Sequence, residues 1–249
     1  MDKTLLKGLE VLEVLALSES PRGVSELARE LQLTRSNVHR TLKTLCVAGY
    51  ARQDEATGNY ECTLKLFQLG GALLSRVDVK RAAEPVMEAL ARKTQETVHL
   101  SALDGIDVIY LHKIDSPQPV RAYSSVAGSA PAYAVATGKA LLAFQSDGYF
   151  DRFEDRLEAF TPRTLATASA LRQEIEIIRQ QGYAINRGEW RVSVWGLAAP
   201  IFDASRRSVA AIGISGPVER LKPMALKAFT PDVVQAARSI SQSLGYVAQ

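Results

Sequence analysis

A short run of residues, Thr34 to Lys43, combines dense hydrogen-bond donors with the absence of acidic side chains. Guanidinium groups pair with guanine edges in the DNA major groove, an amide pairs with adenine, and hydroxyl and ammonium groups suit phosphates. The run therefore predicts contact with double-stranded DNA. Residues expected to read bases or hold the adjoining phosphates are Arg35, Ser36, Asn37 and Arg40, and those expected to hold the backbone are Thr34, His39, Lys43 and Arg52.

Two predicted helices would position these donors. In residues 24–31, apolar side chains recur at helical spacing, and Thr34 is a favourable N-cap residue for a second helix. Val38, Leu42 and Leu45 form one apolar stripe on that second helix, and the donors lie on its other face. This pattern predicts a helix-turn-helix whose second helix enters the major groove.

A β-hairpin is predicted directly after the second helix. Residues 50–53 and 59–63 read as short strands joined by the turn-rich residues 54–58. A hairpin behind a recognition helix is a wing, which weakens the alternative of a surface helical hairpin with a solvated basic face. We predict that residues 1–64 form a winged helix-turn-helix DNA-binding domain.

The N-terminal residues predict a further helix. Residues 3–17 place Leu5, Leu9, Leu12 and Leu15 on one stripe that would pack behind the other two helices. Their mixture of charged and apolar side chains is not that of a signal peptide, and no apolar run in the chain is long enough to span a bilayer. We therefore expect a cytoplasmic protein with no membrane partner.

The next stretch, residues 65–95, predicts linker helices between two domains. A helix over 65–76 would be interrupted by Gly70 and Gly71, and residues 78–94 form a second amphipathic helix. An apolar face in this place packs on a copy of itself or on the next domain. We expect self-association, because groove-binding helices commonly work in pairs across a two-fold axis.

Residues 96–249 predict a mixed α+β domain in which strands come first, helices lie in the middle and strands return. Strands are expected over residues 97–103, 106–112, 120–124, 183–186, 192–202 and 208–215. Helices are expected over residues 137–144, 146–157, 169–182 and 231–244. The fold class is therefore α+β, and the domain has the size of a small-molecule sensor.

Several separated motifs resemble the IclR family of bacterial transcriptional regulators over nearly the whole chain. They are LTRSNVHRTLKTL at 33–45, ETVHLSALDG at 96–105, GSAPAYAVATGKALLA at 128–143, AAPIFD at 198–203 and AAIGISGP at 210–217. The resemblance implies an N-terminal winged helix-turn-helix, a linker helix and a C-terminal GAF-like effector-binding domain. It also implies homodimers, often paired into tetramers as dimers of dimers.

The resemblance also carries an effector pocket onto the C-terminal strands. The family's acidic, cysteine and two serine positions fall in turn on Asn186, Gly196, Gly213 and Ser215, with Val194 in the same stretch. Three of the four matched positions differ from the pattern for small oxoacid effectors. We expect a roomier and less acidic pocket that binds a larger effector.

Other residues near this stretch could contact an effector. Thr137 and Gly138 begin a predicted helix whose free N–H groups suit a carboxylate, although Thr137 could serve only as an N-cap. Arg187 and Glu189 could contact the ligand or each other, and His99 could line the pocket. Aromatic residues that suit an aromatic or other organic acid are Tyr123, Tyr133, Trp190 and Trp195, although the two tryptophans could instead be core or dimer-interface residues.

No sequence pattern requires catalysis, a metal or a cofactor. The ATGKA segment lacks the first glycine and the hydroxyl residue of a phosphate-binding loop, the histidines lack metal-ligand spacing, and no nucleophile elbow is present. The favoured interpretation is a DNA-binding transcriptional regulator controlled by a small organic acid, and not an enzyme. The alternative is a metabolite-binding protein or enzyme whose helix-turn-helix is only an interaction module, but residues 34–43 lack the exposed apolar anchors of a docking face.

Overall fold

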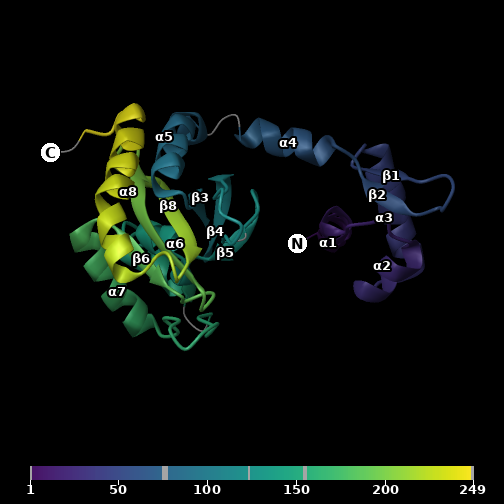
Figure 1. Ribbon diagram of the computed structural model, residues 1–249. Coiled ribbons are helices and arrows are strands. Elements are labelled where there is room, and N and C mark those ends of the chain that lie inside the picture. Colours follow the sequence, from purple (N-terminus) through teal and green to yellow (C-terminus); the bar gives the residue numbers. More distant parts are fainter. Residues whose placement is uncertain (1, 75–77, 123, 154–155, 248–249) are drawn as a thin grey trace. The chain divides into compact units, whose positions relative to one another are not determined.

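The computed structural model describes residues 2–74, 78–122, 124–153 and 156–247. The chain forms two compact units, Met1–Arg76 and Val77–Gln249, each with its own apolar core (Figure 1). Within the residues described, no helix is long and apolar enough to cross a membrane.

The first unit is a three-helix bundle with a two-stranded wing and a fourth helix. Its elements are α1 (Lys3–Leu17), α2 (Val24–Glu30), α3 (Arg35–Val47), β1 (Ala51–Gln53), β2 (Tyr60–Cys62) and α4 (Lys65–Leu74). Val38 and Leu42 of α3 share one core with Leu27 of α2 and Tyr60 of β2. The wing strands pair antiparallel. The predicted winged helix-turn-helix is confirmed.

Helix α1 turns a different face to this core from the predicted one. Val11 and Leu15 are buried, whereas Leu5 and Leu9 are 61% and 47% exposed. Successive residues advance by about 100° around a helix, so Leu9 lies roughly 200° from Val11. Because the core contacts centre on Val11 and Leu15, the predicted placement of Leu5 and Leu9 in the buried stripe is wrong.

Helix α4 continues through its two glycines. The sequence predicted an interruption at Gly70 and Gly71, but one helix covers Lys65–Leu74. Glycine lowers helix stability without forbidding the conformation, so this prediction was wrong. The Lys65 ammonium donates to the Ala48 carbonyl at 2.6 Å and lies 4.4 Å from the centre of the Tyr50 ring. These contacts fasten the start of α4 to the end of α3.

The second unit is a six-stranded antiparallel sheet with helices on both faces. The strand order is β5 (Ser129–Pro131), β4 (Asp107–Ile114), β3 (Thr97–Asp104), β8 (Ser208–Pro217), β7 (Val194–Phe202) and β6 (Ala184–Arg187). One face packs on α5 (Asp78–Thr94) and α8 (Pro223–Ser243), and the other on α6 (Ala136–Leu142), against which α7 (Ala168–Gln181) lies (Figure 1). The predicted α+β class is confirmed.

Side chains on the central strand β8 alternate between two cores. Ile212 and Ile214 join the core beneath α5 and α8, whereas Ala211 joins the core beneath α6. Gly213 and Ser215 lie on the same face as Ala211, because side chains in a strand repeat every two residues. This alternation places small and polar groups beside α6.

Two secondary-structure predictions for the chain between β4 and β6 are wrong. Residues 120–122 and 124 form no strand, and the edge strand is instead β5 at Ser129–Pro131, which pairs with β4. An α-helix was expected over 146–157, but Asp147–Phe153 form a 3-10 helix, η2. Phe150 and Phe153 are buried there, so packing of aromatic side chains fixes a segment with little regular periodicity.

Helix α8 begins earlier than predicted. Pro223 lies in its first turn, where the missing N–H has no helical partner in any case, and Pro231 lies inside the helix. Leu226 and Val233, on either side of Pro231, are buried in the same core. Their burial offsets the lost hydrogen bond, so Pro231 does not start the helix as the sequence suggested.

The apolar face of α5 is covered within its own unit. Val79, Ala83, Met87 and Leu90 belong to the core shared with α8 and the sheet. This corrects the argument that the face is left for self-association, and the oligomeric state stays a prediction. The stretch expected as a linker, residues 65–95, is divided between the two units, because α4 belongs to the first unit and α5 to the second.

Two leucines of α1 provide a test of its orientation. Leu15→Ala should lower the free energy of unfolding by about 2–5 kcal/mol, because the lost side chain is buried. Leu9→Ala removes an exposed side chain and should cost less than about 1 kcal/mol. Urea titration of the full chain, followed by helical circular dichroism, measures both. Equal losses would contradict the observed placement.

Candidate functional site

The donors predicted to contact DNA lie together on the exposed side of α3. Thr34 caps this helix, since its hydroxyl oxygen accepts from the Asn37 backbone N–H at 3.3 Å. The buried side of α3 carries Val38 and Leu42, which are fully inaccessible to solvent. Asn37 is half-buried, and the exposed donors are Thr34, Arg35, Ser36, His39, Arg40 and Lys43.

This face is organised without acidic partners. The Arg40 guanidinium donates to the Asn37 side-chain oxygen at 3.0 Å, so two of the predicted base-reading groups are already linked. Within the described residues, no ion pair involves Arg35, Arg40 or Lys43. Their positive charges are therefore available to DNA phosphates or guanine edges.

Arg52 lies on the wing and has an intramolecular partner. Its Nε is 2.7 Å from a carboxylate oxygen of Glu61 on the paired strand, and its side chain is 71% exposed. The ion pair neutralises part of its charge, but such an exposed pair contributes only about 0–1 kcal/mol to stability. The remaining guanidinium donors stay accessible for a phosphate.

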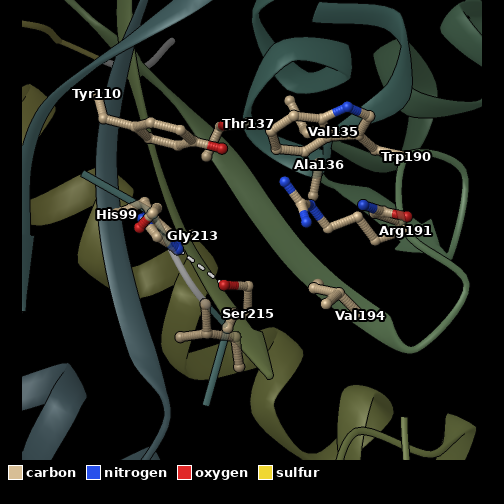
Figure 2. Close-up of a pocket in the computed structure, with 15 residues that line it drawn as sticks. His99, Tyr110, Val135, Ala136, Thr137, Trp190, Arg191, Val194, Gly213 and Ser215 are labelled. Carbon is tan, nitrogen blue, oxygen red and sulfur yellow. Dashed lines mark hydrogen bonds between the residues drawn. The ribbon is translucent and has the colours of Figure 1, made fainter. Parts of the chain in front are cut away.

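A cavity in the second unit lies between the sheet and the 186–194 segment, which comprises the end of β6, the following loop and the first residue of β7 (Figure 2). Its walls come from β3, β4, β7, β8 and the start of α6. The lining residues are His99, Tyr110, Ala122, Ser124, Val135, Ala136, Thr137, Asn186, Trp190, Arg191, Val194, Gly196, Gly213, Ile214 and Ser215.

The cavity is small. Water-sized spheres can place their centres in about 50 Å³ of it. About 10–15 Å³ of that space holds one water, so the enclosed part of the cavity has room for on the order of three to five waters. This size suits a small organic acid with at most one ring. It does not support the expected enlargement.

His99 forms the polar centre of the sheet wall. Its Nε2 lies 2.7 Å from the Ser215 hydroxyl, and its Nδ1 lies 3.5 Å from the Ser124 hydroxyl. Burial, together with the positive charge of Lys113 and against the opposing effect of Asp115, lowers the pKa of His99 to about 4. The imidazole is therefore neutral near pH 7 and offers hydrogen bonds rather than a charge.

Tyr110 and Arg191 are cavity residues that sequence reasoning missed. Figure 2 shows Trp190 and Arg191 across the cavity from His99 and Tyr110. Burial raises the pKa of Tyr110 to about 12, with Arg191 opposing the rise, so the phenol is a neutral donor. The Arg191 guanidinium lies 4.8 Å from the centre of the Trp190 ring. Its position one residue after Trp190 was the available sequence signal.

Arg191 supplies the charge that the cavity otherwise lacks. No ion pair of the described residues involves Arg191, and no carboxylate lines the cavity. A guanidinium beside neutral hydroxyl groups and an indole face can bind a carboxylate attached to a flat apolar body. The cavity therefore favours a monocarboxylate over a neutral or cationic ligand.

The structure separates the predicted effector residues into two groups. Gly138 and Glu189 lie outside the cavity lining, whereas the residues that line it are Thr137, Asn186, Val194, Gly196, Gly213 and Ser215. A Cβ at Gly138 would collide with the backbone of Ala132 in the 3-10 helix η1 (Ala132–Ala134), so glycine permits close packing there. Glu189 instead forms a buried ion pair with Lys139 at 3.0 Å.

The two cavity glycines do not leave free volume. A Cβ at Gly213 would lie 2.7 Å from both the Leu197 carbonyl oxygen and the Ala198 Cβ, and one at Gly196 would lie 2.9 Å from the Ile214 carbonyl oxygen. Any side chain there would have to displace the neighbouring strand. Compared with the cysteine and serine of the family pattern, these glycines make the wall less polar without enlarging the cavity.

Of the three aromatic residues singled out in the sequence that the structure describes, only Trp190 lines the cavity. Trp195 belongs to the core beneath α5 and α8. Tyr133 is buried, and its hydroxyl donates to the Glu158 carbonyl at 3.0 Å. Tyr123 lies outside the described residues. The core alternative therefore holds for Trp195, and Tyr133 is also a core residue.

Both units match known protein families. The family model described as "IclR helix-turn-helix domain" matches residues 4–55. The model described as "Bacterial transcriptional regulator IclR C-terminal" matches residues 71–242. Together these two matches cover most of the chain.

Full-length relatives support the same assignment. The chain is 35% identical to the HTH-type transcriptional regulator KdgR of Escherichia coli (strain K12), over 98% of this chain and 93% of KdgR. A crystal structure of a putative transcriptional regulator from Rhodococcus sp. RHA1 is 30% identical, with a TM-score of 0.82 over 98% of each chain. An IclR homolog from Microbacterium hydrocarbonoxydans, complexed with 4-hydroxybenzoate, also has a TM-score of 0.82, over 97% of this chain and 99% of that one. At 22% identity, that last likeness shows the fold alone.

His99 should make the second unit less stable in mild acid. Its pKa in the folded protein, about 4, lies below the ordinary value of 6.5, so the unfolded chain takes up the proton first as the pH falls. The free energy of unfolding therefore begins to fall as the pH drops through about 6.5, and it is roughly 2 kcal/mol lower at pH 5 than at pH 7. Urea unfolding at both pH values should show a smaller acid loss for His99→Gln than for the unaltered protein. Equal losses would contradict a buried neutral His99.

Proposed function

Because this chain belongs to the IclR family of bacterial transcriptional regulators, we propose that a small organic acid, bound in the cavity, controls its binding to a double-stranded DNA operator through α3 and the wing. The chain is a transcriptional regulator and not an enzyme. The observation that carries the proposal is the acid-free donor face of α3, held in place by the Thr34 cap.

The contacts on DNA divide by chemistry. Arg35, Ser36, Asn37 and Arg40 lie in the first turns of α3, where a recognition helix reaches base edges or the adjoining phosphates. Backbone phosphates are assigned to the more peripheral donors, which are Thr34, His39, Lys43 and the wing residue Arg52. Paired recognition helices need a homodimer or a dimer of dimers, and such a regulator acts in the cytoplasm, where bacterial DNA lies.

The effector is assigned as a small monocarboxylate, with an aromatic acid favoured. Arg191 provides an unpaired guanidinium, and Tyr110 and Ser215 provide neutral hydroxyl groups around the same space. The Trp190 ring and the adjoining apolar wall suit a planar ring. The small enclosed volume, about 50 Å³, favours a ligand of about one ring.

Effector control requires that the ligand favour one conformation of the protein. A ligand shifts an equilibrium only by its difference in affinity for the two states. The 186–194 segment encloses part of the cavity. A ligand that binds only when Arg191 and Trp190 take one particular position therefore favours the conformation with that position. Whether the selected state binds DNA more or less tightly sets the sign of regulation.

Arg40→Ala should weaken DNA binding while leaving the second unit intact. The loss is expected at about 5- to 150-fold on a duplex that the unaltered protein selects from a random-sequence library, as for a lost guanidinium contact of about 1–3 kcal/mol. Fluorescence anisotropy over a range of salt concentrations measures it. Arg238→Ala, which removes the same charge from an exposed site on α8, is the control and should have no effect. Unchanged affinity in Arg40→Ala would overturn the assignment of α3.

Arg191→Ala should abolish effector binding and spare DNA binding. Thermal shift against benzoate, 4-hydroxybenzoate, pyruvate and glyoxylate identifies carboxylates that stabilise the unaltered protein, because a ligand of the native state raises its melting temperature. Arg187→Ala is a matched control, since Arg187 is exposed and lies outside the cavity lining. A carboxylate that stabilises Arg191→Ala as much as the unaltered protein would refute this role, and stabilisation by the two oxoacids alone would refute the preference for a ring.

A further inference from the structure

Three ionisable side chains meet beside the cavity wall: Lys139 and Glu189 are buried, and Glu174 is half-buried. The Lys139 ammonium donates to Glu174 Oε1 at 2.9 Å, to Glu189 Oε1 at 3.0 Å and to the Ile185 carbonyl oxygen at 2.8 Å. The Lys139 side chain has no solvent exposure, and that of Glu189 is 8% exposed. All three donor hydrogens of the ammonium group therefore have acceptors inside the protein.

The hydrogen bonds of the Glu189 carboxylate do not compensate fully for its burial. Its second carboxylate oxygen, Oε2, is buried and has no hydrogen-bond partner among the described residues. A buried charge with an unsatisfied oxygen is costly, so a pair of this kind is weak evidence for a stabilising role. A role in fixing one particular local arrangement accounts better for its presence.

The Lys139–Glu189 pair joins two walls of the cavity. Lys139 follows the lining residue Thr137 by two positions on α6. Glu189 directly precedes Trp190 and Arg191, which line the cavity from the 186–194 segment. The ion pair therefore connects the α6 wall to the residues that face the ligand space.

Other bonds of this segment come from neutral groups and from the Arg163 guanidinium, which donates to the Arg187 carbonyl oxygen at 2.9 Å. The Asn186 side-chain oxygen accepts from the backbone N–H groups of Gly188 and Glu189, and its nitrogen donates to the Ala134 carbonyl at 3.2 Å. The Thr164 hydroxyl donates to the Glu189 carbonyl at 2.6 Å. These bonds shape the backbone turn, but among the residues described the Glu189 side chain alone forms an ion pair between this segment and α6.

We infer that Glu189 is a positioning residue, which sets Trp190 and Arg191 over the cavity through its ion pair with Lys139. This inference rests on the proposed function for its biological meaning, because it concerns the wall that would hold the effector. The positioning itself is a property of the protein without ligand. It can therefore be measured without knowing the effector.

Glu174 offers a matched control. It binds the same ammonium group at nearly the same distance, but it belongs to α7 and contributes no residue to the 186–194 segment. Glu174→Gln and Glu189→Gln each remove the negative charge of one carboxylate that binds the Lys139 ammonium, without changing side-chain shape. A purely structural role of the buried lysine predicts similar effects, whereas positioning predicts an effect on the cavity wall from Glu189→Gln alone.

Trp190 can report the position of the wall. The chain has two tryptophans, so Trp195→Phe leaves Trp190 as the sole indole. The Trp195 ring nitrogen is buried without a hydrogen-bond partner among the described residues, so this replacement loses no hydrogen bond. Acrylamide quenching and the emission maximum of Trp190 then measure how open the segment is.

In the Trp195→Phe background, Glu189→Gln should raise the quenching constant of Trp190 at least about twofold and shift its emission to the red, because loss of the negative charge weakens the tether to Lys139 and exposes the segment. Glu174→Gln should leave both unchanged. Thermal unfolding followed by circular dichroism verifies that each variant is folded. Equal quenching in all three proteins, or an equal rise in both Gln variants, would overturn the inference.

Two further outcomes are decisive. Loss of the folded second unit in Glu189→Gln would also overturn the inference, since Glu189 would then be required for folding rather than for positioning. A failure of the proposed function appears elsewhere, in the binding of DNA by Arg40→Ala and of carboxylates by Arg191→Ala. Increased quenching in Glu189→Gln alone would support the inference even if none of the four acids binds.

Discussion

The two-residue alternation along β8 is the constraint on which the second unit depends. It sends Ile212 and Ile214 into the core beneath α5 and α8, and it leaves Gly213 and Ser215 on the α6 side. The glycine lets β7 and β8 keep their register where any side chain would strike the neighbouring strand. Ser215 is thereby placed beside His99 of β3. A slip of one residue would exchange the two faces and fill the cavity with isoleucine.

The recognition helix could be predicted from the sequence because its determinants are local. The Thr34 cap joins residues three positions apart, and the apolar stripe follows the helical period. The cavity wall could be predicted only in part. Arg191 and Glu189 are two residues apart and have different roles, and the partner that distinguishes them, Lys139, is 50 positions from Glu189. Short-range patterns likewise do not show which face of α1 meets the wing, so the burial of Leu9 was predicted wrongly.

The ATGKA segment has structural duties that explain its residue types. Gly138 allows α6 to approach the backbone of Ala132, and Thr137 meets the cavity one residue earlier. Lys139 is buried among acceptors from α7, β6 and the 186–194 segment. A glycine next to a lysine therefore serves close packing and a buried ion pair here, which separates the segment physically from the phosphate-binding loops that share part of its pattern.

Two cationic side chains bind backbone acceptors on an edge strand of the sheet. Strand β6 ends the sheet, and an uncovered edge strand is a template for adding strands from another molecule. The Ile185 carbonyl accepts from Lys139, and the Arg187 carbonyl accepts from Arg163 at 2.9 Å. Both acceptors lie on alternate residues of β6 and are occupied by cationic side chains. The same lysine that braces the cavity therefore occupies a backbone acceptor of this edge strand.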